Sequence, residues 1–236
     1  ALLVKAVTVI ANTQATGNEA TIIGGYAKAV TFSVTDTGAN IAAANTSALS
    51  EAVDITVNDT ATVVQAEFIE ARTNSGTNTY SITDSAANLA ASSNDVLTKA
   101  STVEANTSAT KSEADTIASF AKAVTYNISD TAANISGGTD EGRNEAVNII
   151  AETDATYAQA KAISDATNSG TNTYNVDDSA AALVAGISTD STALLGAGTI
   201  TADVNPNFAQ ALTLAGLSKS IVYSISDIPN NLPATV

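Results

Sequence analysis

One short pattern recurs five times along the chain and constrains its fold more than any other feature. The pattern joins an aromatic residue, an aliphatic residue two places later and an aspartate two places after that. Consecutive aromatic residues lie 48, 46, 48 and 49 positions apart. The five copies are Phe32–Asp36, Tyr80–Asp84, Tyr126–Asp130, Tyr174–Asp178 and Tyr223–Asp227. Such regular self-similarity is typical of stacked repeats rather than of one globular core.

A weaker series lies between these copies, and each of its members ends in Asn or Asp after an aliphatic stretch. Its members end at Asn12, Asp59, Asn106, Asp154 and Asp203. Merging both series gives steps of 22 to 25 residues, so the elementary repeat has about 24 residues. It occurs in two alternating types, which we call aromatic repeats and intermediate repeats. Four repeats make a longer period of 94 residues, since Thr73–Tyr80 recurs unchanged as Thr167–Tyr174.

Within each aromatic repeat, a short alternating stretch predicts a strand. In the second copy, Tyr80 and Ile82 would face a core, whereas Ser81 and Thr83 would face solvent. The aspartate that follows is expected to be the N-cap of a helix, because the residues after it include apolar residues at helical spacing. Asn205–Pro206 is expected to supply a similar cap and the first helical residue.

A strand and a helix within about 24 residues cannot bury the apolar face of the strand alone, but stacked copies can. The sequence therefore predicts an α/β fold. We expect residues 1–236 to form a single solenoid fragment of about ten strand–helix coils with a parallel sheet, similar in principle to leucine-rich repeats. An all-β solenoid is the alternative.

The composition excludes several classes of function. The chain has no His and no Cys, so the usual catalytic triads, thiol nucleophiles and zinc sites cannot form. Its net charge of −15 argues against a nucleic-acid partner, and no apolar run is long enough to span a membrane. We therefore predict that the chain is not an enzyme. The absence of Cys and Met, with many Thr, Ser and Asn, favours an extracellular bacterial protein.

The Tyr80–Leu89 stretch and its near-copy Tyr126–Ile135 resemble segments of the long repeat arrays in giant bacterial secreted and cell-surface proteins. Those arrays belong to adhesin-like or surface-layer-like chains. The resemblance implies an extracellular or cell-surface location and no catalytic residues. It covers nearly the whole chain through the repeats, although Pro229 and Pro233 interrupt the pattern in the last copy.

Together these observations predict a structural repeat segment that serves as a stalk, coat or filament subunit. The expected partners are other copies of the chain or flanking repeats, in contact end to end or side by side. Stacked strands leave unpaired edges at both ends of an array, and Leu2–Val4 begin the chain without a polar cap. The acidic surface would keep such an array soluble.

The solvent-facing side of the predicted strands is a candidate binding surface. Its small polar groups form a flat, mostly hydroxyl-bearing array, which suggests an alternative function as a binding module for a glycan or ice. The same residues are also good strand formers, so a purely solvated face is the competing interpretation. The candidate residues are Thr31, Ser33, Thr35, Thr79, Ser81 and Thr83.

The aligned Asn and Asp residues are a second candidate site, because rows of carboxylates can bind Ca²⁺. The calcium candidates are Asp36, Asp84, Asp130 and Asp178. Capping of each repeat's own helix explains the same residues without an ion, and the nonapeptide of calcium-binding β-rolls is absent. We therefore expect no metal and no cofactor, with calcium as the one alternative.

Overall fold

The computed structural model describes residues 5–232, so Leu2–Val4 and Pro233 lie outside the described part. The chain divides into two compact units. Unit 1 comprises 1–107 and 120–125, and unit 2 comprises 108–119 and 126–236. Both units are α/β, as the sequence predicts, and their helices exclude the all-β alternative. That one continuous solenoid runs through 1–236 stays a prediction.

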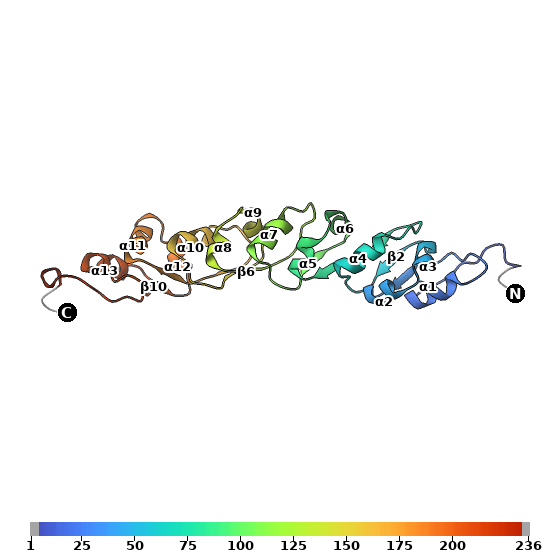
Figure 1. Cartoon of the computed structure of the whole chain (residues 1–236), viewed down its shortest axis with the longest axis horizontal. Coiled ribbons are helices and arrows are strands. Elements are labelled where there is room, and N and C mark those ends of the chain that lie inside the picture. Colours follow the sequence, from blue (N-terminus) through green and yellow to red (C-terminus); the bar gives the residue numbers. More distant parts are fainter. Residues whose placement is uncertain (1–4, 233–236) are drawn as a thin grey trace. The chain divides into compact units, whose positions relative to one another are not determined.

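Unit 1 contains six helices and five short strands among its described residues (Figure 1). The helices are α1 (Gly17–Gly24), α2 (Gly38–Ala43), α3 (Thr46–Glu51), α4 (Val63–Glu70), α5 (Ala86–Ala91) and α6 (Asn94–Lys99). The strands are β1 (Val34–Asp36), β2 (Ile55–Val57), β3 (Asn78–Thr79), β4 (Ile82–Asp84) and β5 (Val103–Ala105).

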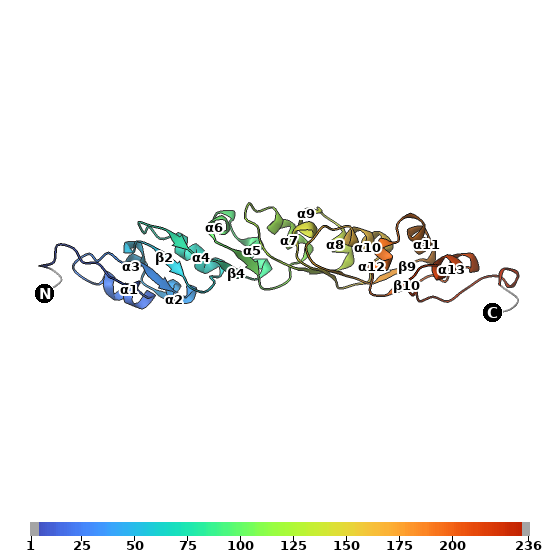
Figure 2. The same ribbon diagram turned by 180° about the vertical axis from the view of Figure 1, so that it is seen from behind.

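Unit 2 repeats this arrangement, and Figure 2 shows its helices α8, α10 and α11 on the same side of strands β9 and β10. Its helices are α7 (Lys111–Ala118), α8 (Ala132–Ser136), α9 (Glu141–Glu145), α10 (Tyr157–Ser164), α11 (Ala180–Thr189), α12 (Thr192–Gly196) and α13 (Phe208–Ala215), followed by the 3₁₀ turn η2 (Pro229–Asn231). Its strands are β6 (Ile128–Asp130), β7 (Ile149–Ala151), β8 (Asn172–Thr173), β9 (Val176–Asp178) and β10 (Ile200–Ala202). No described helix is long and apolar enough to cross a membrane.

The strands of successive repeats pair in parallel, as predicted. Val34 lies opposite Ile55 in unit 1, and Ile128 lies opposite Ile149 in unit 2. The pairing does not form one continuous sheet: the described residues form four sheets of two or three strands, β1-β2-β3, β4-β5, β6-β7-β8 and β9-β10. In the first four aromatic repeats the start of the strand pairs only with the preceding repeat, as Thr31 does with Ile10, whereas its end pairs with the following repeat and also forms an isolated bridge to the preceding one, as Val34 does with Ile55 and Ala15.

The first four aromatic repeats each hold two helices rather than the single helix expected from the sequence, and the described part of the last holds only the 3₁₀ turn η2. Leu89 and Leu97, which lie eight residues apart, belong to α5 and α6 and are both fully buried. Between these helices Ser92 and Ser93 are extended, which ends one helix and begins the next. An intermediate repeat holds one helix of eight residues, as in α4.

The core of each unit is a row of Ala, Val, Ile and Leu side chains, with one aromatic ring from each of the first four aromatic repeats. Phe32, Tyr80, Tyr126 and Tyr174 are at most 3% exposed. The buried hydroxyl groups of the three tyrosines donate to backbone carbonyls, for example from Tyr80 to Val96 at 3.1 Å. This satisfies the polar end of a ring that is otherwise in an apolar environment.

Candidate functional site

The five aspartates of the aromatic repeats make one recurring set of contacts. We call Asp36, Asp84, Asp130, Asp178 and Asp227 the linking aspartates. One carboxylate oxygen of each accepts a hydrogen bond from the first backbone N–H of the helix in the preceding repeat. These bonds join Gly17 to Asp36, Val63 to Asp84, Lys111 to Asp130, Tyr157 to Asp178 and Phe208 to Asp227 at 2.9–3.0 Å. A short side chain thereby fastens two consecutive repeats together.

The other carboxylate oxygen binds within its own repeat. In Asp84 this oxygen accepts from the backbone N–H of Ser85 and from the side-chain amide of Asn88, both at 2.8 Å. The same pair of bonds recurs around Asp36, Asp130 and Asp227, whereas Asp178 keeps only the backbone bond because Ala182 replaces the asparagine.

The expectation that these aspartates are N-caps is wrong. The N-cap is the residue that follows, such as Ser85, whose hydroxyl accepts the N–H of Asn88. The aspartate stands one place before the cap, where its carboxylate can reach the preceding repeat. Nor does Asn205–Pro206 begin a helix: α13 starts at Phe208 with Asn207 as its N-cap.

Sequence reasoning missed a second regular feature, the capping boxes of the intermediate helices. In α1, Thr16 accepts the N–H of Glu19 while the Glu19 carboxylate accepts the N–H of Thr16. Four further helices, α4, α7, α10 and α13, have the same reciprocal pair. The signal was present in the sequence as Thr or Asn followed three places later by Glu or Gln.

Hydrogen bonding lowers the pKa of four linking aspartates below the ordinary value. For Asp84, burial alone would raise the pKa, but bonds from Asn88, Val63 and Ser85 together lower it. Asp36, Asp130 and Asp227 have lowered pKa values from the equivalent donors. These carboxylates therefore stay ionised at neutral pH and their lone pairs are used by the protein's own N–H groups.

The intermediate repeats form a less regular series than the sequence suggested. The position equivalent to a linking aspartate is Asp59, Thr107 or Thr153, whose side-chain oxygen accepts from the first N–H of the helix in the preceding repeat at 2.8–3.1 Å. Asn106 and Asp154, which the spacing grouped with Asp59, lie one residue away from this position. Hydroxyl and carboxylate oxygens can both accept this bond, so the residue type varies between intermediate repeats while the contact is kept.

The residues described show no arrangement suited to a metal ion. No group of three or more acidic side chains within 5–232 could hold one. The calcium candidates Asp36, Asp84, Asp130 and Asp178 are separated from one another by a full pair of repeats and each binds backbone N–H groups instead. N–H donors of the protein itself thus make these contacts between repeats.

The candidate Thr/Ser face has the alternation that the sequence indicated. Thr31 and Thr79 are exposed, and the other four candidates, Ser33, Thr35, Ser81 and Thr83, are half-buried between buried core residues. Several hydroxyl groups bond to neighbouring repeats: Ser33 pairs with Asp54, Thr35 donates to Gln14 at 2.6 Å, and Ser81 accepts from Thr102 at 2.9 Å. Much of the hydrogen-bonding capacity of this face is therefore used inside the protein.

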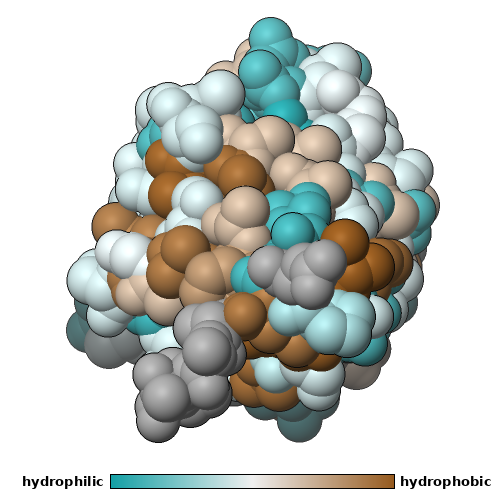
Figure 3. Space-filling model, turned by 90° about the vertical axis from the view of Figure 1, so that its left-hand side faces the viewer, coloured by the Kyte–Doolittle hydropathy of each residue, from teal (hydrophilic) through white to brown (hydrophobic). Residues whose placement is uncertain are grey.

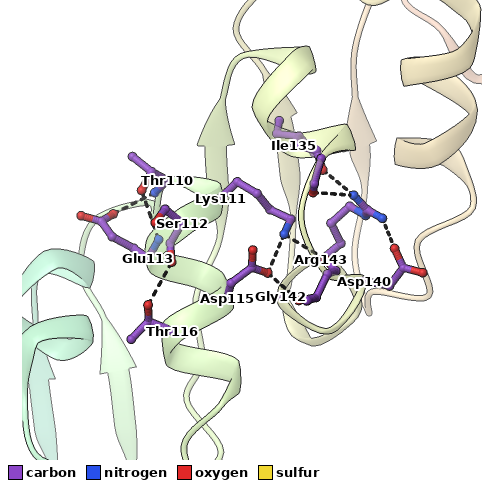
Figure 4. A network of polar contacts seen from close by, with 12 residues as sticks. Thr110, Lys111, Ser112, Glu113, Asp115, Thr116, Ile135, Asp140, Gly142 and Arg143 are labelled. Atoms are coloured by element: carbon purple, nitrogen blue, oxygen red, sulfur yellow. Dashed lines mark hydrogen bonds and ion pairs between the residues drawn. The ribbon is translucent and has the colours of Figure 1, made fainter.

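A buried ionic network in unit 2 was not anticipated from the sequence (Figure 4). The Lys111 side chain is 4% exposed, and its ammonium group bonds the Asp115 carboxylate and the carbonyl of Thr139. Gly138 makes room for this pair. It has φ +73°, and a Cβ there would lie 2.7 Å from the Asp115 carboxylate and 3.0 Å from the Lys111 nitrogen.

Arg143 takes the place of a core leucine in the same network. In unit 1 and near the end of unit 2, the residue after the carbonyl that accepts the tyrosine hydroxyl is Leu97 or Leu194, both fully buried. The corresponding residue after Gly142 is Arg143, which is 5% exposed. Its guanidinium group donates to the carbonyls of Ile135 and Gly137 at the end of α8 and pairs with Asp140. The protein's own acceptors thus occupy the group, which indicates a structural role.

One carboxylate has the opposite electrostatic environment to the linking aspartates. Burial, together with the nearby charges of Asp203, Asp154 and Asp178, raises the pKa of Asp177. One oxygen of Asp177 is buried without a hydrogen-bond partner. This residue is therefore a local source of strain rather than a contact that holds the repeats together.

No family model, no curated protein and no solved structure matches this chain in the three comparisons made.

Proposed function

We propose that the chain is a structural, non-enzymatic segment of an extracellular or cell-surface bacterial repeat protein, serving in a stalk, coat or filament. In this proposal the repeats of each unit stack as a solenoid on the principle of leucine-rich repeats. The adhesin-like and surface-layer-like arrays that Tyr80–Leu89 resembles are the nearest functional analogy.

One observation carries the proposal: the most regular polar residues of the described chain connect repeat to repeat and are spread over separate junctions instead of gathering in one pocket. Asp84 binds the N–H of Val63 from the preceding repeat, and Asp130 binds that of Lys111 in the same way. An enzyme or a receptor would concentrate its recurrent polar groups at one place. Here each copy sits at its own junction, which is the arrangement a load-bearing stack needs.

The backbone supports the same interpretation. At each of four junctions the aromatic residue's carbonyl accepts an N–H from the next repeat, as Tyr80 does from Ser101 at 2.8 Å. The offset between partners in these strand pairs is close to one repeat, so that consecutive repeats lie against one another.

The extracellular location rests on composition and resemblance, and it has a direct test. Intact cells of the bacterium that makes this chain would be treated briefly with a protease, and the released peptides identified by mass spectrometry. We expect peptides of this chain among those released, with cytoplasmic marker proteins absent. Recovery only after cell lysis would overturn the proposed location.

The alternative of a glycan- or ice-binding module concerns the Thr/Ser face. Ser81→Lys with Thr83→Lys would place two long cations on that face, and Ala39→Lys, on an exposed turn of α2, is a matched control. Under the structural proposal, the wild-type chain shows no glycan binding and no inhibition of ice growth. Activity that is lost in the double variant and kept in the control would favour the binding module instead.

A further inference from the structure

A hollow of about 260 Å³ lies between helices α9 and α10 of unit 2, in the interior of the repeat series. Its lining residues are Asp140, Arg143, Asn144, Ala162, Asp165 and Ala166. Apolar side chains also gather on the end of unit 2 that holds its last repeats (Figure 3), but a surface of that kind accepts any apolar neighbour. The hollow between α9 and α10 combines alanine side chains with charged groups, so its lining can define a ligand.

Two large side chains of unit 1 stand at the positions equivalent to the two alanines. One long period of 94 residues earlier, Ala162 corresponds to Phe68 and Ala166 corresponds to Arg72. Both of these side chains are half-buried. The guanidinium carbon of Arg72 lies 4.4 Å from the centre of the Phe68 ring, and its Nε donates to the Phe68 carbonyl at 3.0 Å. The aromatic ring and the planar cation therefore stack as one unit.

The helix that carries these positions is built in the same way in both units. Helices α4 and α10 each have eight residues, and each begins with a capping box of Thr and Gln. Arg143 in α9 is longer than its counterpart Leu49, but Figure 4 shows its guanidinium group directed to Asp140 and to the end of α8. The hollow of unit 2 therefore lies where unit 1 has its stacked ring and guanidinium group.

The rim of the hollow carries two carboxylates in place of uncharged residues of unit 1. Asp140 replaces Thr46, and Asp165 replaces Ala71. The two aspartate side chains are 76% and 57% exposed. One oxygen of Asp140 pairs with Arg143, and the other accepts no hydrogen bond from the described part of the chain. A charged acceptor is therefore available at the rim.

The neighbouring cations leave this rim negative. Arg143 pairs with Asp140, and Lys161 pairs with both Asp165 and Asp190. Three carboxylates thus share two cations, which leaves a net charge of −1. Unit 2 as a whole has 14 acidic and four basic residues, against ten and five in unit 1. The local and the overall charge both favour a positive ligand over a phosphate or a carboxylate.

We propose that this hollow is a docking site for a partner chain, which inserts an aromatic ring and an arginine one helical turn apart. The two groups that unit 2 has lost relative to unit 1 define the shape of the ligand, and the two carboxylates that it has gained define the charge. Phe68 and Arg72 show how such a pair stacks. The inference goes beyond the proposed structural role and does not depend on it.

The ligand chemistry can be tested with small probes on the full chain. Benzamidinium combines an aromatic ring with a planar cation, whereas benzyl alcohol is its neutral analogue and benzoate its anionic one. Amide NMR shifts would follow each titration. We expect benzamidinium to shift the amides of Asn144 and Ala166 and to bind at least about fivefold more tightly than benzyl alcohol, with no binding of benzoate. Added salt should weaken the binding of benzamidinium.

A peptide arm distinguishes a partner chain from a free aromatic cation. An acetylated and amidated pentapeptide with Phe first, Arg last and three Ala between them places the two side chains as α4 does. It is expected to shift the same amides, and replacing its Arg by Gln should weaken binding at least about fivefold. Binding of benzamidinium without binding of this peptide would overturn the assignment to a partner chain.

Variants that restore the residues of unit 1 test the location. Ala162→Phe with Ala166→Arg rebuilds the stacked pair inside unit 2 and should abolish binding of benzamidinium. Asp165→Ala leaves the space open but removes a rim carboxylate, so it should weaken benzamidinium at least about threefold and leave benzyl alcohol unchanged. Ala39→Arg, on an exposed turn of α2, adds the same charge away from the hollow and is the matched control.

Circular dichroism confirms folding of each variant, and Asp165→Ala decides the question if the double variant does not fold. Three results would overturn the docking site: amides of the hollow that do not respond to benzamidinium, equal affinity for benzyl alcohol, or unchanged affinity for benzamidinium in Asp165→Ala. None of them bears on the cell-surface test of the proposed function, so the two can fail separately.

Discussion

The second and the last aromatic repeats contain the same motif in two different settings. Asp84 and Asp227 make the same three hydrogen bonds, to the preceding helix, to the next backbone N–H and to an asparagine four residues on. Yet the settings differ. Asp84 is 8% exposed and Ile82, two residues before it, is buried, whereas Ile225, two residues before Asp227, is 47% exposed. The polar contact is thus local to one junction, while burial depends on the repeat that follows.

The structure that follows the linking aspartate also differs between these two repeats. After Asp84, Ser85 caps helix α5 and Ala86 is its first residue. After Asp227, Ile228 offers no capping oxygen and Pro229 begins the short 3₁₀ turn η2. The difference teaches that the linking aspartate keeps its contacts whatever structure follows it, and that the burial of a repeat comes from the neighbour that covers it.

The largest effect is expected from removing the carboxylate where it is buried. Asp84→Ala leaves the N–H groups of Val63 and Ser85 without acceptors, and it should lower the free energy of unfolding of unit 1 by about 4 kcal/mol. Asp227→Ala removes the same bonds in an open setting, where water replaces them, and should have a much smaller effect. Urea unfolding followed by circular dichroism compares the two. Equal losses of unfolding free energy in the two variants would contradict the expected dependence on burial.

A second effect concerns whether the buried Arg143 stabilises unit 2 as well as a core leucine would. Arg143→Ala opens a cavity and leaves the Ile135 carbonyl unpaired, so we expect unit 2 to lose about 3 kcal/mol. Arg143→Leu restores the residue found at Leu97 and Leu194 and should lose about 1 kcal/mol. Thermal melts of both variants measure this. If leucine were as damaging as alanine, the guanidinium bonds themselves would be the essential contact.

Acid should weaken the junctions in a defined pH range. Because the folded pKa values of Asp36, Asp84 and Asp130 are lowered, their contribution is fully present above the unfolded pKa of about 3.9. It is lost as the pH falls below that value through the lower folded pKa values. The stability difference between wild type and Asp84→Ala should therefore shrink between pH 5 and pH 2. A difference that stays constant over this range would show that ionisation is irrelevant to the contact.

The smallest effect has the opposite sign. The raised pKa of Asp177 means that its ionised form opposes folding above the unfolded pKa. Asp177→Asn should raise the free energy of unfolding of unit 2 by about 0.5 kcal/mol at pH 7. The gain should vanish near pH 3, where the wild-type carboxyl is protonated. A destabilised variant at pH 7 would mean that the carboxylate has a partner that this account lacks.

Much of the repeat architecture could be predicted from the sequence because it depends on short-range patterns. The alternation around Tyr80 and Ile82 reported the buried face, and the spacing of the aspartates reported the period of the parallel pairing. The prediction of a single helix per aromatic repeat was wrong, because helical spacing of apolar residues does not reveal the extended Ser92 and Ser93 that separate two helices.

The polar contacts were harder to predict, since they depend on which residue of the next repeat comes within reach. Asp84 looked like a cap because it precedes a helix, but its second oxygen reaches Val63 twenty-one residues earlier. Arg143 did have a sequence signal that was missed: it lies 17 residues after Tyr126, as the buried Leu49 and Leu97 lie 17 residues after Phe32 and Tyr80. The capping boxes could have been found from spacing alone.

Hydrogen exchange at single amides tests most directly whether the linking aspartates hold consecutive repeats together. In the wild-type chain the Val63 amide, bonded to Asp84, should be protected, and in Asp84→Ala it should exchange at close to the rate of an unstructured amide. The Lys111 amide, bonded to Asp130 in unit 2, serves as the internal control and should be unchanged. Equal protection of Val63 in both proteins would contradict the account.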